Sequence, residues 1–133
     1  MTTMQMVGFA GIAPEVIIEL KKGRTRTLEF INAQNVISAV SVNVDDLIFV
    51  STISHEDLSP GDGGIVATVT ATSTIMQRMS STAPGIYYEE RERLLVRLQM
   101  KFACTSHIRK ILERGYCRVL IVEVAEYSCP RAK

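Results

Sequence analysis

Alternating apolar and polar positions dominate this 133-residue chain and predict a domain built mainly of β-strands. The clearest alternation is 65–76, where threonines at even positions follow apolar residues at odd positions. The threonine face is predicted to be more exposed, with Thr68, Thr70, Thr72 and Thr74 on it. The apolar face comprises Ile65, Ala67, Val69, Ala71 and Ile75.

A second long alternation, Tyr87 to Phe102, predicts a strand that pairs with 65–76 across the loop 80–85. Shorter runs predict further strands at 4–9, 24–31, 47–53 and 118–126. Within 24–31, one face carries Arg24, Arg26, Leu28 and Phe30.

Helix signals predict two or three short helices. Pro14 suits a first helical turn, and Gly23 supplies a left-handed stop after Lys21 and Lys22, so we expect a helix over 14–22. Its buried stripe is predicted to be Val16, Ile17 and Leu20. A helix from Asn32 through 37 and one from Ser106 to Gly115 complete the set.

Five or six short strands with two or three helices fit a single α+β domain spanning 1–133. Strands this short and numerous commonly close into a barrel, because closure hides their edges. We therefore predict a small, mostly antiparallel β-barrel.

Composition narrows the function classes. Lys+Arg 15 against Asp+Glu 14 gives a net charge of +1, so any binding of nucleic acid requires a local basic patch. The apolar runs are too short to span a membrane, and no signal peptide is expected. Cys104, Cys117 and Cys129 are odd in number and lack C-x-x-C spacing, which predicts reduced thiols and a cytoplasmic protein.

Candidate chemistry is sparse. The loop 54–64 contains His55, Glu56, Asp57 and Asp62, but the spacing matches no metal motif, and turn capping by Asp57 is the simpler interpretation. Its "GDGG" lacks the Lys-Ser/Thr of a phosphate-binding loop. We predict no metal, no cofactor and no catalytic residue.

A basic stripe is the main surface signal. The stripe occupies one face of the predicted long strand and comprises Arg91, Arg93, Arg97 and Lys101. Arg24 and Arg26 could extend it. The alternative is an ordinary solvent-exposed strand face, whose positive charge Glu89 partly offsets.

The segment 14–72 resembles the ASCH (activating-signal-cointegrator-homology) branch of the PUA-like barrels. That branch ends a helix in glycine and then places a lysine, a glutamate and an arginine on the first barrel strand. Gly23, Arg26, Thr27 and Glu29 can be laid on this motif, and Asp46-Leu47-Ile48 on the next strand. The pattern departs at Arg26 in place of lysine, at Ile31 in place of arginine, at Asp45 in place of glycine and in one inserted residue.

The resemblance implies a ligand cleft between the first helix and the barrel. Some relatives use the lysine in catalysis on modified pyrimidines, a role that an arginine cannot fill because it stays protonated. The whole chain is also similar to an uncharacterised archaeal family through "EDLSPGDGGIVA", "MQRM" and "YYEERE". That similarity implies an archaeal cytoplasmic protein.

The leading hypothesis is a module that binds RNA, a modified nucleoside or a nucleotide-like ligand. The predicted ligand-binding residues are Gly23, Arg24, Arg26, Thr27, Glu29 and Arg78. Two alternatives are an amidohydrolase-type enzyme and a protein–protein interaction domain, and an exposed barrel edge could form a homodimer. For Arg26 the alternative is an ion pair with Glu89 or Glu90 that serves stability alone.

Overall fold

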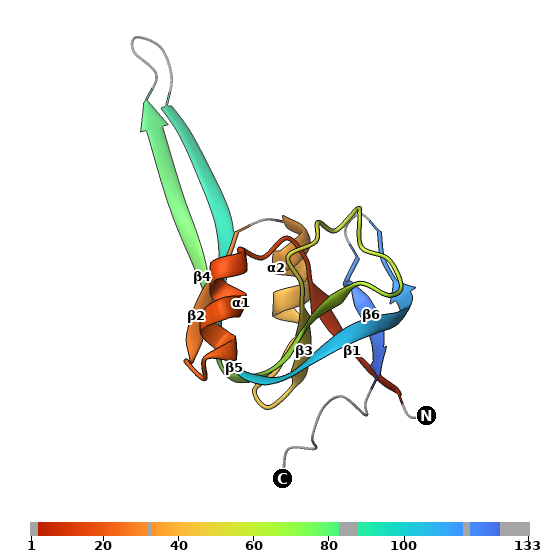
Figure 1. The fold of residues 1–133 in the computed structure, drawn as a ribbon. Helices are drawn as coiled ribbons and strands as arrows, with labels where there is room; N and C mark the ends of the chain where they lie inside the picture. Colours follow the sequence, from red (N-terminus) through yellow and green to blue (C-terminus); the bar gives the residue numbers. More distant parts are fainter. Residues whose placement is uncertain (1–2, 32, 83–87, 116–117, 126–133) are drawn as a thin grey trace.

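A computed structural model shows one six-stranded mixed sheet and, among the described residues, two helices (Figure 1). It describes the backbone of residues 3–31, 33–82, 88–115 and 118–125, and their side chains except those of 33 and 77–93. The elements in chain order are β1 (Thr3–Phe9), α1 (Pro14–Lys21), β2 (Arg26–Phe30), α2 (Ala33–Val40), β3 (Leu47–Val50), β4 (Gly63–Thr82), β5 (Tyr88–Glu113) and β6 (Ile121–Ala125). The α+β prediction is confirmed at this level.

The strands lie in the order β2-β5-β4-β3-β1-β6, with a further pairing between β5 and β6. All pairings are antiparallel except that of β1 with β3, which is parallel. Because β5 is long, its middle part (96–100) pairs with β2 and its last part pairs with β6. β6 therefore has β1 on one side and β5 on the other.

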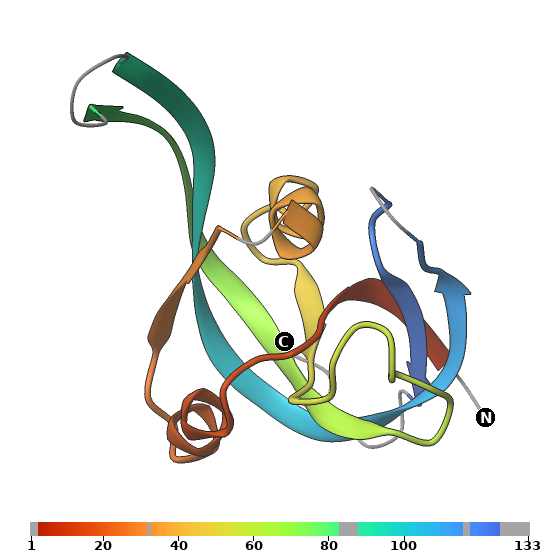
Figure 2. The same ribbon diagram turned by 90° about the horizontal axis from the view of Figure 1, so that it is seen from above.

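Beyond the body of the sheet, β4 and β5 continue together as a two-stranded arm (Figures 1 and 2). The predicted pairing of these two strands is confirmed, with Thr68 opposite Lys101 and Thr82 opposite Tyr88. The predicted loop 80–85 begins too early, because Ser80–Thr82 still belong to β4.

The predicted threonine face of β4 is confirmed, since Thr70, Thr72 and Thr74 are exposed, but the predicted apolar face holds only as far as Val69. Ile65, Ala67 and Val69 are buried while Thr70 is exposed, as expected. A register shift between Val69 and Ala71 then inserts one unpaired residue, so Ala71 is exposed instead of buried. A bulge of this kind reverses the facing of every later residue in the strand.

The helix predicted from Ser106 to Gly115 is wrong. Residues 106–113 continue β5 and pair with β6, for example Ile111 opposite Val122. Apolar residues at Ile108, Ile111 and Leu112 fit a helical period as well as a strand, and the partner strand decides between them. Ser106 Oγ donates to the carbonyl of Ala125 at 3.2 Å instead of capping a helix.

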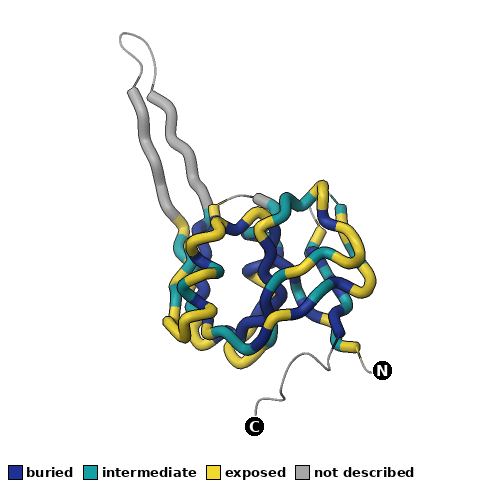
Figure 3. The backbone as a smooth tube through the Cα atoms, in the orientation of Figure 1, coloured by how far each residue is buried: buried dark blue, intermediate teal, exposed yellow. Residues whose placement is uncertain are grey.

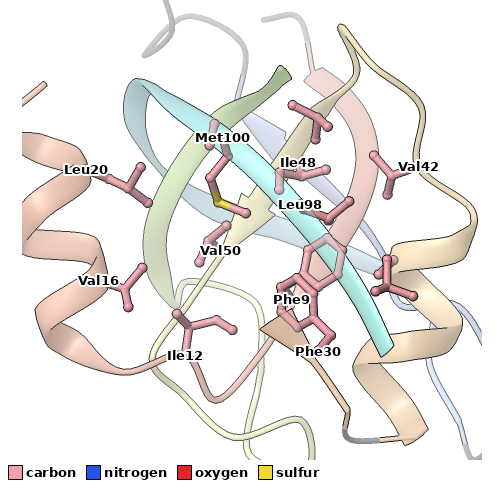
Figure 4. Close-up of a cluster of buried hydrophobic side chains, with 14 of the residues drawn as sticks. Phe9, Ile12, Val16, Leu20, Phe30, Val42, Ile48, Val50, Leu98 and Met100 are labelled. Atoms are coloured by element: carbon pink, nitrogen blue, oxygen red, sulfur yellow. The ribbon is translucent and has the colours of Figure 1, made fainter. Parts of the chain in front are cut away.

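The apolar core forms two clusters on opposite faces of shared strands. Figure 3 shows that the buried residues gather in the body of the molecule, where the strands and helices meet. Cluster 1 lies between the helices and the sheet and includes Phe9, Val16, Leu20, Phe30, Ile48, Val50, Leu98 and Met100 (Figure 4). Phe9 and Phe30 stack there with ring centroids 4.9 Å apart. Cluster 2 lies on the other side, with Met6, Phe49, Leu58, Val66, Cys104, Ile108, Val122 and Val124.

Cys104 in cluster 2 is disulfide-bonded, so the prediction of reduced thiols is wrong for this residue. Within the described ranges neither helix is long and apolar enough to span a membrane. A cytoplasmic location remains a prediction.

Both helices pack on cluster 1. α1 begins at Pro14 and buries Val16 and Leu20, and Ile17 is half-buried, as its stripe predicted. α2 extends to Val40, three residues beyond the predicted 37, and its expected cap, Asn32, lies outside the described residues.

Candidate functional site

The turn from α1 to β2 positions most of the predicted ligand-binding residues. Gly23 adopts φ +85°, a left-handed conformation in which a side chain would be strained, and its amide donates to the carbonyl of Leu20 at 2.9 Å. The helix therefore stops where the sequence indicated. Arg24 follows in the turn and is exposed.

Arg26 links β2 to α1. Its Nη1 donates to Glu19 Oε2 at 2.8 Å, and both side chains are about one-third exposed. Arg26 therefore has a carboxylate partner, as the stability alternative required, and this partner is Glu19. The predicted partners Glu89 and Glu90 lie outside the described side chains. Opposite Met100 in the sheet, Arg26 lies on the half-buried face of β2.

Thr27 and Glu29 lie on the opposite, exposed face of β2, because side chains alternate along a strand. Glu29 is directly opposite Arg97 on β5 and accepts a hydrogen bond from Arg97 Nε at 2.8 Å. The structure thus divides the predicted site between two faces. Arg78 lies in β4 opposite Glu92, away from both faces of β2, and its side chain is not described.

An open groove of about 450 Å³ does lie between α1 and the sheet. One wall is apolar and comes mainly from the helix through Pro14, Ile17 and Ile18, with Ile65 of β4. The remaining lining residues are Lys21, Thr52, Gly63, Gly64, Thr105 and Ser106. The predicted cleft therefore has a counterpart, but none of the six predicted ligand-binding residues lines it.

Three exposed cations lie at the end of α1 that borders the groove: Lys21, Lys22 and Arg24. None of the three forms an ion pair within the part of the chain that the structure describes. Sequence reasoning used Lys21 and Lys22 only as helix-end residues. The missed signal was that Lys21 and Lys22 follow an apolar helix face, formed by Pro14, Ile17 and Ile18, that lines the groove.

The acidic loop 54–62 is organised by its own turns. Ser54 Oγ donates to Asp57 Oδ2 at 2.8 Å, and the amide of Ser59 donates to Asp62 Oδ2 at 2.7 Å. The turn interpretation of Asp57 is therefore confirmed. Among the described residues, no group of three His, Cys, Asp or Glu is close enough to hold a metal ion.

Comparison with known proteins relates the chain to a protein family and to an archaeal protein. A family model described as a protein of unknown function (DUF473) matches residues 4–122. An uncharacterised protein of Methanocaldococcus jannaschii is 28% identical over 98 residues, which cover 74% of this chain. The chain spans 60% of that relative's length.

Proposed function

Because the chain belongs to the DUF473 family of proteins of unknown function, we propose from the site that it binds RNA or a nucleotide-like ligand. The observation that carries this proposal is the meeting of an open groove with a group of cations at the C-terminal end of α1. A base or nucleoside would enter the groove, and the phosphate would lie against the cations.

The chemistry of the groove suits a planar, partly polar ligand. Small-molecule sites are largely apolar with a few polar groups that set orientation. Ile17 and Ile18 offer an apolar wall, and Thr52 and Thr105 offer hydroxyl groups that can donate or accept. At Gly63 and Gly64 the strand side of the groove carries no side chain, which leaves room there for a ligand.

The cations suit a phosphate. Lys21 lies in the groove lining itself, and Arg24 adds a planar guanidinium that can contact two phosphate oxygens at once. Such contacts to a nucleic acid release counterions, so the binding should weaken with salt. Gly23 would contribute indirectly, because it ends α1 and so holds Lys21 and Arg24 on either side of the turn.

The proposed fold type is a PUA-like barrel of the ASCH kind. Its support is the order of the elements and the additional pairing of β5 with β6, which joins β6 to a strand near the other end of the sheet order. In this proposal Arg26 positions α1 through Glu19, while Thr27, Glu29 and Arg78 lie outside the groove.

The other hypotheses have less support. Among the described residues that line the groove, none is a carboxylate that could act as a proton carrier, which gives the amidohydrolase alternative less support. A homodimer through a sheet edge stays a prediction. β2, at one end of the strand order, is the edge that the body of the sheet offers for it.

Two sets of variants test the proposal by fluorescence anisotropy with labelled single-stranded RNA and with a nucleoside monophosphate. Lys21→Gln and Arg24→Gln should each weaken RNA binding severalfold and lower the slope of log affinity against log salt by about 0.7. Lys110→Gln, an exposed cation of β5 opposite Glu123, is the matched control and should change neither quantity.

Gly63→Leu tests the groove. An added Cβ at this glycine would meet nothing closer than the Ser106 carbonyl oxygen at 3.9 Å, so the variant should fold and place its side chain at the groove. We expect it to lose binding of the nucleoside monophosphate. Absence of binding by the wild-type protein, or equal losses with Lys110→Gln, would refute the proposed function.

A further inference from the structure

One edge of β4 loses its partner partway along the strand. β3 covers this edge as far as Thr68. Next to it, the amide of Val69 donates to the carbonyl of Asp46 at 2.9 Å, and the amide of Asp45 donates to the carbonyl of Val69 at 2.8 Å. Over 71–82, β4 pairs with β5 on its other side, and no described residue pairs with this edge. We call this stretch the free edge, because its outward backbone groups are available to another strand.

The arm that carries the free edge is only two strands wide. The pairing of β5 with β2 ends at Val96, which is opposite Thr74, so β4 and β5 continue alone beyond that point (Figure 2). Their pairing then runs without a further register shift as far as Thr82 opposite Tyr88. A two-stranded ribbon is marginally stable in water, and a third strand commonly stabilises it. The free edge is the longer of the two open edges of the arm, so it is where a further strand gains most.

The free edge lacks the features that keep strand edges apart. Natural edges are protected by charged side chains, prolines or bulges. Over 63–77 the sequence has no charged residue and no proline. The side chains of 71–74 and of Met76 are nevertheless exposed. By contrast, the open edge of β2 carries two charged residues, Arg26 and Glu29. The chain therefore protects one open edge with charge and leaves the other unprotected.

Met76 lies midway along the free edge and is 61% exposed. That is the largest exposed fraction among the large apolar side chains that the structure describes. Methionine is enriched at interfaces between proteins, and removing its apolar surface from water favours association. Met76 thus marks the middle of a surface that a further strand would cover.

We propose that two copies of this chain pair through their free edges, antiparallel and about a two-fold axis near Met76. Because β3 and the residues before it occupy the edge as far as Val69, each arm can overlap only the arm of the other copy. The start of one free edge then lies beside the end of the other. The two ribbons form one four-stranded sheet with both β4 strands in its centre, and about a dozen residues per strand span roughly 40 Å. This association does not depend on the proposed function.

A second copy suits the free edge because the edge is uncharged where its side chains are described. Pairing about a two-fold axis brings equivalent residues close together, which is unfavourable for like charges and favourable for β-branched or apolar residues. Thr72, Thr74 and Met76 carry no charge, and threonine is well suited to a strand. A two-fold pair is also closed, since each copy uses this edge once and no longer chain of copies follows.

Sedimentation velocity over a wide range of protein concentrations measures the association. The wild type should form a dimer. Met76→Lys should weaken it about tenfold or more, because it removes a buried apolar group and brings two like charges together near the axis. Ile31→Lys is the matched control, since Ile31 is 54% exposed and directly follows β2, and it should leave the dimer unchanged. Circular dichroism should show that both variants fold, because both side chains are exposed.

Hydrogen exchange locates the interface. Amides of 71–76 that point away from β5 should exchange more slowly as the wild type dimerises, and the amides of 26–30 should not change. A wild type that is monomeric at every concentration, a dimer that Met76→Lys leaves intact, or a dimer lost in Ile31→Lys would overturn the proposal. Slower exchange at 71–76 only after addition of an unrelated strand-forming peptide would overturn it too, by assigning the free edge to another partner.

Discussion

Gly64 is a position where only glycine fits. A Cβ built on it would lie 2.5 Å from the Val50 carbonyl oxygen and 2.6 Å from the Phe49 ring. Since these neighbours are backbone and a fully buried ring, they have little room to move. Gly64→Ala should lower the free energy of unfolding by about 1–3 kcal/mol, as overpacking does.

Urea unfolding followed by circular dichroism measures this loss. Gly63→Ala is the control, because its Cβ would have 3.9 Å to the nearest atom, and it should change stability by less than about 1 kcal/mol. Equal stability of the two variants would show that the backbone at 64 is not confined as described.

The pair of Arg26 and Glu19 should contribute little to stability. Both side chains are about one-third exposed, and ion pairs of this kind are usually worth about 0.2–1 kcal/mol. A double-mutant cycle with Arg26→Ala and Glu19→Ala should give a coupling energy within that range. A coupling above about 2 kcal/mol would mean that the pair is far better shielded from water than its exposure indicates.

At the level of elements, β5 determines most of the fold, because it pairs with β2, β4 and β6. Leu98 is fully buried in cluster 1, whereas its neighbour Gln99 faces the half-exposed side. Leu98→Asp should destabilise by about 4 kcal/mol or more, because a buried carboxylate would lack a partner.

Thermal unfolding of Leu98→Asp and of the control Gln99→Asp checks this assignment. The control should melt within a few degrees of the wild type, since its new charge remains hydrated. If Leu98→Asp melted like the wild type, the assignment of Leu98 to the buried face of β5 would be wrong.

Sequence patterns predicted most elements, because the period of apolar residues and the residues that end helices are local signals. Pro14 and Gly23 fixed α1, and alternation fixed β4 and the first part of β5. The patterns failed where a distant partner decides, as at 106–113, where pairing with β6 makes a strand. A bulge is equally hidden, so the exposure of Ala71 could not be read from its neighbours.

The site was predicted less well than the fold for the same reason. Arg26 and Glu29 stood out as charged strand residues, but each meets a carboxylate or guanidinium from another element. The groove arises where α1 lies against 63–65 and 105–106, segments far apart in sequence. Only tertiary packing brings Lys21 to that place.

For the molecule as a whole, the two clusters should unfold together. β3 contributes Ile48 and Val50 to cluster 1 and Phe49 to cluster 2, so neither cluster can open without exposing the other. Native-state hydrogen exchange should give the amides of Val50 and Val122 opening free energies within about 1 kcal/mol of each other. A much lower value at Val122 would show that cluster 2 opens by itself.

The pairing of β1 with β6 sets a condition on biosynthesis. β1 leaves the ribosome well before its antiparallel neighbour, which comes from 121–125, with Met6 opposite Val122. Until that late segment emerges, the edge of β1 and the apolar side chains of cluster 2 stay without their cover. Such edges recruit other chains, so the nascent protein depends on prompt completion or on a chaperone for this interval.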